Sequence, residues 1–148
     1  MLLLNMIHNN DKKKICVIDG QGGGIGSIII KKLKCIFKES IEIIALGTNA
    51  IATTQMLKAR ANCGASGENA IMQSIKNADI IIGPISIIMA NSMMGEVTPQ
   101  IAEAAASSKA KKILLPVTQE NIEIVGLDYI PLPHLIDLLI HENLKNII

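Results

Sequence analysis

The chain has 148 residues and a mass of 15.9 kDa, which fits a single domain. Hydrophobic residues make up 49% and charged residues 18%, a balance that excludes a disordered chain and favours a sheet buried on both faces. A net charge of +1 and an aromatic content of 1% argue against a nucleic-acid partner, because both a basic surface and stacking rings are lacking. We expect residues 1–11 to be a flexible N-terminal tail and residues 12–148 to form one domain.

The predicted elements alternate between short β-branched runs and segments of helical periodicity, which is the pattern of a parallel sheet covered by helices. Strands are expected at 14–19, 41–46, 79–83, 112–115 and 121–125, and helices at 25–38, 50–59, 68–77, 99–108 and 133–147. Residues 62–67 are expected to form a loop, and residues 84–97 fit either a helix or a hairpin. The predicted fold is a three-layer α/β domain of the Rossmann-like type, with about five mainly parallel strands.

The compartment is predicted from the cysteines and the apolar segments. Cys16, Cys35 and Cys63 match neither a disulfide framework nor a zinc site, which favours a reducing cytoplasm. The apolar opening, residues 1–7, lacks the basic start and cleavage site of a signal peptide. Residues 80–94 are apolar but are interrupted by glycine, proline and polar residues, so they do not form a membrane span. We therefore predict a cytoplasmic protein with no membrane association.

A glycine-rich segment, DGQGGGIG at residues 19–26, joins the first predicted strand to the first predicted helix. Glycines let a ligand approach the backbone closely, and the free amides at a helix start bind phosphate. Five glycines exceed what packing a helix on a strand needs, so we predict that this loop binds a phosphorylated metabolite or nucleotide. The predicted binding residues are Asp19, Gly20, Gln21, Gly22, Gly23, Gly24, Ile25 and Gly26 of the loop, with Thr48, Asn49 and Asn91 from later turns.

A nicotinamide cofactor fits the sequence less well than another phosphorylated ligand. The glycine spacing at 20–26 resembles the cofactor loop of short-chain dehydrogenases, but the dinucleotide spacing G-x-G-x-x-G is not met. Thr48 and Asn49 stand where a dinucleotide site has an acidic residue. Pro133 lies four residues after Tyr129, where a short-chain dehydrogenase has its lysine. A degenerate NAD(P)-binding, oxidoreductase-like domain is therefore the least favoured hypothesis.

Two carboxylates, Asp19 and Glu96, are weak candidates for catalysis, as general bases or as ligands of a Mg²⁺ ion bridging to phosphate. Asp19 equally fits a carboxylate that bonds to the amides of its own turn. The sequence therefore leaves open whether the chain is an enzyme, and no metal site is predicted. The second hypothesis is a non-catalytic sensor or interaction module. Methionines at 89, 93 and 94 fit either the core or a subunit interface, and an exposed apolar loop there would favour a homo-oligomer or a mobile lid.

Several short segments together resemble a family of small bacterial proteins that share a domain of unknown function. They are VIDGQGGGIG at 17–26, ALGTNA at 45–50, GENA at 67–70, IGPI at 82–85, ANSM at 90–93 and GE at 95–96. The resemblance covers about residues 14–137 and implies a bacterial cytoplasmic protein. It carries no established activity and no catalytic residue.

Overall fold

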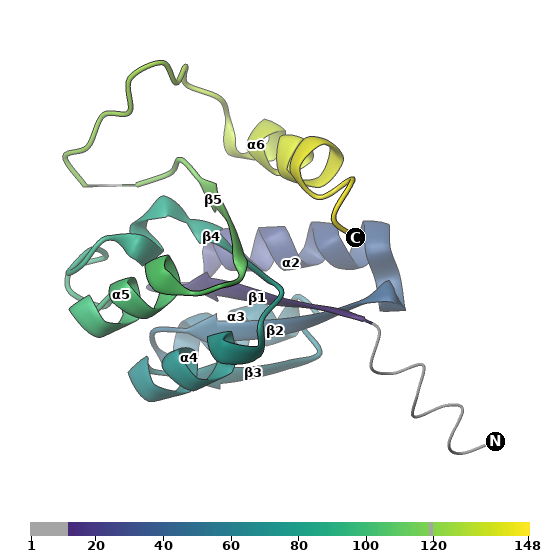
Figure 1. The fold of residues 1–148 in the computed structure, drawn as a ribbon, viewed down its shortest axis with the longest axis horizontal. Helices are drawn as coiled ribbons and strands as arrows, with labels where there is room; N and C mark the ends of the chain where they lie inside the picture. Colours follow the sequence, from purple (N-terminus) through teal and green to yellow (C-terminus); the bar gives the residue numbers. More distant parts are fainter. Residues whose placement is uncertain (1–11, 119) are drawn as a thin grey trace.

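Five parallel strands form the centre of the protein (Figure 1). The structure is a computed structural model, and it describes residues 12–118 and 120–148. The strands are β1 (Lys13–Asp19), β2 (Ile41–Gly47), β3 (Cys63–Ser66), β4 (Ile80–Pro84) and β5 (Lys111–Leu115). Their order across the sheet is β3-β2-β1-β4-β5, and every pair is parallel. This arrangement confirms the predicted Rossmann-like fold. The predicted tail, residues 1–11, lies outside the described residues.

Helices cover both faces of the sheet and make it a three-layer structure (Figure 1). The helices of one face are α2 (Gly24–Phe37), α3 (Ala50–Lys58) and α6 (Leu132–Leu138), and those of the other are α4 (Glu68–Ser74) and α5 (Pro99–Ser107). Side chains of a strand alternate between the two faces, so Val17 packs in the first layer and Ile18 in the second. Both faces are buried, which explains why the strand sequences are continuously apolar.

Side-chain caps fix the starts of two of these helices. The side-chain oxygen of Asn49 accepts a hydrogen bond from the Ala52 amide at the start of α3. The Thr98 hydroxyl accepts one from the Ile101 amide, and Pro99 takes the first position of α5. Both caps satisfy amides that have no partner inside the helix. The start of α2 differs, because its capping position is Gly23, which has no side chain to do this.

Four predictions of local structure need correction or completion. Residues 62–67 are not only a loop, since Cys63–Ser66 form β3 at the edge of the sheet. The run 121–125 was predicted as a strand but is irregular and exposed. The sheet reaches five strands through β3 instead. Residues 84–97 form a short 3-10 helix at Ile85–Ile88 followed by turns. The last α-helix ends at Leu138 and is followed directly by a π-helix, Leu139–Asn143.

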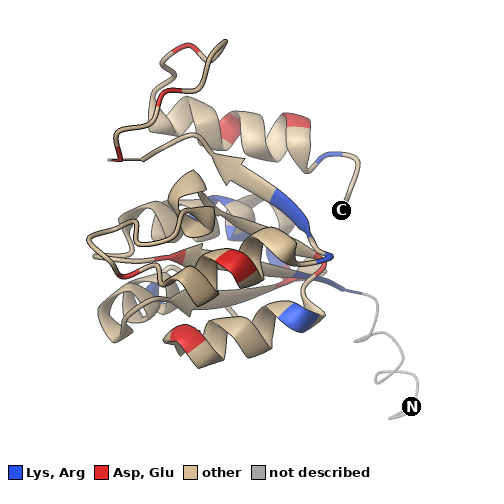
Figure 2. Ribbon diagram, turned by 60° about the vertical axis from the view of Figure 1, so that its left-hand side comes forward, with Lys and Arg blue, Asp and Glu red and all other residues tan. Residues whose placement is uncertain are grey.

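The two edges of the sheet differ in charge. Lys13, Lys14 and Lys111 are exposed where the strands begin, and Figure 2 shows lysines gathered at this edge. These lysines form a solvated rim, in keeping with the usual behaviour of a charge run. In the described part of the chain, no helix has both the length and the apolar character needed to cross a bilayer.

Candidate functional site

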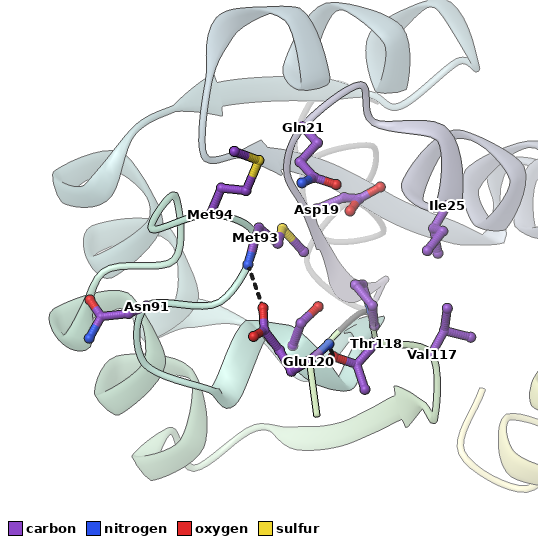
Figure 3. A pocket seen from close by; sticks show the side chains of 11 residues that line it. Asp19, Gln21, Ile25, Asn91, Met93, Met94, Val117, Thr118 and Glu120 are labelled. Atoms are coloured by element: carbon purple, nitrogen blue, oxygen red, sulfur yellow. Dashed lines mark hydrogen bonds between the residues drawn. The ribbon is translucent and has the colours of Figure 1, made fainter. Parts of the chain in front are cut away.

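The strand order changes direction between β1 and β4, and ligands of open α/β sheets bind beyond the carboxyl ends of the strands at such a point. A cavity of about 360 Å³ lies there (Figure 3). Its walls come from the turn after β1, the segment after β4 and the segment after β5. The topology therefore brings three distant parts of the sequence to one crevice.

Three of the five loop glycines are required by packing around the loop. A Cβ atom on Gly20 would lie 2.6 Å from the sulfur of Met93, and one on Gly26 would lie 2.5 Å from the sulfur of Met56. Gly23 has a φ of +71°, and its Cβ would lie 2.7 Å from the carbonyl oxygen of Ala52. Gly23 and Gly26 let α2 pack closely on α3 and β1, and Gly20 leaves room for Met93 and Thr48, so the presence of these three glycines needs no ligand.

The other two loop glycines, Gly22 and Gly24, are not required by packing. A Cβ atom on either would meet nothing within 4 Å, and neither residue has a positive φ. Both are exposed, and among the described residues neither amide has a hydrogen-bond acceptor. Two small residues with free amides thus face open space at the start of α2.

Asp19 is 4% exposed and holds the loop from inside. Its Oδ1 accepts from the Gly20 amide at 2.8 Å, and its Oδ2 accepts from the Gly26 amide at 2.7 Å. Burial raises the pKa of Asp19, and the nearby charge of Glu96 adds to this rise, while the amide hydrogen bonds oppose it. Each oxygen accepts one amide of the turn, so Asp19 holds the loop in this conformation.

Glu96 reaches across the end of β1 and ties the segment after β4 to the end of β2. Its Oε1 accepts from the Gln21 amide at 2.9 Å, the Thr48 hydroxyl at 2.7 Å and the Asn49 side-chain amide at 2.7 Å. Burial alone raises the pKa of Glu96, but these three hydrogen bonds together outweigh it and the pKa lies below its usual value. We call the group Gln21, Thr48, Asn49 and Glu96 the Glu96 bridge.

The structure brings only some of the predicted site residues together. Those that line the cavity are Asp19, Gln21, Ile25 and Asn91, while Thr48 and Asn49 belong to the Glu96 bridge. The five predicted glycines, Gly20, Gly22, Gly23, Gly24 and Gly26, do not line the cavity. Seven residues that line the cavity were not predicted from the sequence: Pro84, Ser86, Met93, Met94, Val117, Thr118 and Glu120. The signal that could have found Ser86, Thr118 and Glu120 is their position just after the strands β4 and β5.

Two other kinds of site, a reactive cysteine and a metal site, receive little support from the described residues outside this crevice. Cys63 is exposed, but burial raises the pKa of its thiol, which is the opposite of what an activated nucleophile needs. No group of three or more His, Cys, Asp or Glu side chains in the described part of the chain is arranged to hold a metal ion.

The sheet order and the cavity at its switch point define a Rossmann-like α/β domain with a crevice in the usual ligand position. The sequence profile of the family described as "Domain of unknown function (DUF3842)" matches residues 14–148, and the chain belongs to this family. A search of curated proteins and a search of solved structures found no match. The family gives no activity, so the function has to be argued from the site.

Proposed function

We propose that the protein binds a phosphorylated metabolite or nucleotide, with the phosphate on the amides of Gly22 and Gly24 at the start of α2. The observation that carries this proposal is the division of the loop glycines, since two of the five serve no packing purpose and leave free amides in open space. A phosphate oxygen accepts hydrogen bonds from such amides and is favoured by the helix dipole.

Asp19 is compatible with an anion at this loop because it does not use the amides of Gly22 and Gly24. Its carboxylate bonds to the buried amides of Gly20 and Gly26, whereas Gly22 and Gly24 are exposed. The roles of Asp19 and Glu96 in holding the loop are structural, so the proposal is of binding, and neither carboxylate is assigned a catalytic role.

A thermal-shift experiment with an external dye tests the proposal, because the chain has no tryptophan to report unfolding. The ligands are ATP, GTP, NAD(H), NADP(H) and sugar phosphates, each with and without Mg²⁺. A ligand that binds the folded state raises the melting temperature by mass action. We expect at least one phosphorylated compound to raise it, and the corresponding compound without phosphate to have no effect. No shift with any compound contradicts the proposal.

A second proposal, that the protein works as a homo-oligomer, rests on the segment between β5 and α6. Residues 121–129 are all exposed, and Figure 1 shows the segment standing away from the sheet. Val125 is 100% exposed and Tyr129 is 92% exposed. Fully exposed apolar side chains such as that of Val125 are typical of a contact with another chain.

Light scattering on a size-exclusion column tests this second proposal over a range of protein concentrations. We expect a mass of two or more chains for the wild-type protein. The double variant Val125→Asp and Tyr129→Asp should have the mass of one chain, because a charge in an apolar contact is costly. A wild-type protein that stays monomeric at all concentrations contradicts the proposal.

A further inference from the structure

We infer that the ligand contains one phosphorylated sugar, as a free sugar phosphate or a mononucleotide does, and that the cavity binds this sugar. The sugar extends over β4 and β5 toward Ser86. The inference rests on the proposed function and adds the direction and the chemical class of the ligand. It separates this site from a dinucleotide site, in which the ligand also extends over β2.

The side of the crevice over β2 is closed by the Glu96 bridge. Glu96 hydrogen-bonds to Thr48 and Asn49 at the end of β2, so these polar side chains are already engaged. Met93 lies against Gly20, where a Cβ atom would be 2.6 Å from its sulfur. A ligand whose phosphate sits on the loop therefore finds its open space over β4 and β5, where the cavity lies.

Ser86 supplies a free polar group inside this cavity. The residue is 5% exposed and lines the cavity. Its carbonyl oxygen accepts from the Ser92 hydroxyl and from the Met89 amide, which fixes its backbone. Within the described residues, however, the Ser86 hydroxyl itself makes no hydrogen bond. Among the described residues every fully buried side-chain oxygen has a partner, so the Ser86 hydroxyl is open to the cavity, where it can bond to a hydroxyl group of the ligand.

The charges of the lining select a neutral, hydroxyl-bearing group for the cavity. Asp19 and Glu120 line it, and among the described residues no lysine or arginine does. A second phosphate there would face two carboxylates with no compensating cation. Glu120 uses its Oε1 to accept from the Met93 amide at 3.2 Å (Figure 3), and its Oε2 makes no hydrogen bond to any described residue. A carboxylate oxygen of this kind accepts from a sugar hydroxyl.

The size of the cavity agrees with a small ligand. Its volume of about 360 Å³ lies near the lower end of the range for small-molecule sites, which is roughly 300 to 1,000 Å³. The side chains of Ile25, Met93 and Val117 supply apolar surface for the carbon face of a sugar ring. The site thus has amides for one phosphate, polar groups for hydroxyls and apolar side chains between them.

Isothermal titration with four probes tests the inference: inorganic phosphate, ribose 5-phosphate, AMP and NAD⁺. We expect ribose 5-phosphate and AMP to bind more tightly than inorganic phosphate, and NAD⁺ to bind no more tightly than AMP. A free sugar phosphate and a mononucleotide are distinguished by whether ribose 5-phosphate or AMP binds more tightly.

Ser86→Ala should weaken ribose 5-phosphate binding about fivefold, which is the usual effect of losing one neutral hydrogen bond, and should leave the affinity for inorganic phosphate unchanged. Ser108→Ala is the matched control, since Ser108 does not line this cavity, and it should change neither affinity. Glu120→Gln is a second test that leaves Ser86 and its neighbours unchanged. It should also weaken ribose 5-phosphate binding.

The outcomes separate this inference from the proposed function. If NAD⁺ binds more tightly than AMP, or if Ser86→Ala and Glu120→Gln both leave ribose 5-phosphate binding unchanged, the direction over β4 and β5 is wrong while phosphate binding at the loop still stands. If none of the four probes binds while another phosphorylated compound raises the melting temperature, the inference is wrong and the proposed function still stands. If no phosphorylated compound binds in either experiment, both are contradicted.

Discussion

Replacing Gly24 with valine is expected to weaken the binding of phosphorylated ligands about a hundredfold and to leave the fold intact. The valine side chain would occupy open space at the start of α2, next to the free amides of Gly22 and Gly24. Two hydrogen bonds from these amides to a charged phosphate are worth about 1.5 kcal/mol each, and about 3 kcal/mol corresponds to a hundredfold in affinity. Isothermal titration with the compound that gives the largest thermal shift measures the effect.

The stability of the Gly24 variant should differ little from that of the wild type. The new Cβ meets nothing within 4 Å, and valine has a slightly better helix propensity than glycine. Gly23→Ala is the informative contrast, because its φ of +71° and the nearby Ala52 carbonyl should cost about 2 kcal/mol. Ala50→Val is the matched control, since Ala50 is the exposed first residue of α3, and it should leave binding unchanged. A Gly24→Val protein that is folded and binds normally would show that the phosphate does not lie on this loop.

The fold was predictable where burial and sequence pattern agree. β1, β2 and β4 are apolar runs buried on both faces, and each of them was predicted to within two residues. β3 was missed because its four residues, Cys63–Ser66, contain no β-branched or large apolar side chain and lie mostly exposed at the edge of the sheet. Its strand conformation comes from pairing with β2, a tertiary contact that the local sequence does not encode.

The run at 121–125 shows the opposite error. Ile122, Ile124 and Val125 have high β propensity, but in the structure they are exposed and pair with no described strand. β propensity reflects packing against neighbouring strands, so it has little effect where no such neighbour is present.

The candidate site was predictable to the level of the sheet edge and the glycine loop. The carboxyl ends of parallel strands meet at one edge, which is why Asp19, Gln21 and Asn91 come together at the cavity. The order of the strands was not predictable, and it places β4 and β5 beside β1. Ser86 and Glu120 follow strand ends that the sequence already places at this edge, but only the strand order puts them in one cavity with Asp19 and Gln21. The pairing of Glu96 with Thr48 and Asn49 likewise depends on how the segment after β4 crosses β1.

Replacing Asp19 with alanine is expected to destabilise the protein by about 3 kcal/mol at neutral pH. The change leaves the buried amides of Gly20 and Gly26 without their acceptor, and each unsatisfied amide costs about 1 to 3 kcal/mol. The matched control is Asp79→Ala at the opposite end of the sheet. Asp79 is exposed and accepts from one amide, that of Lys14, at 2.8 Å, so its loss should cost less than about 1 kcal/mol. Urea unfolding of the three proteins measures both differences.

The pH dependence of the Asp19 effect tests its physical cause. Burial raises the pKa of Asp19 above its ordinary value of 3.8, so the folded protein holds this proton more tightly than the unfolded chain does. The stability linked to that proton is fully present below pH 3.8 and is lost as the pH rises through the raised pKa. Alanine does not titrate, so the stability difference between wild type and Asp19→Ala should shrink as the pH rises through this window. A difference that instead grows with pH would mean that the amide hydrogen bonds outweigh burial and lower the pKa of Asp19. The Asp19 carboxylate would then be stabilised in its charged form and would itself be the anion bound at the start of α2.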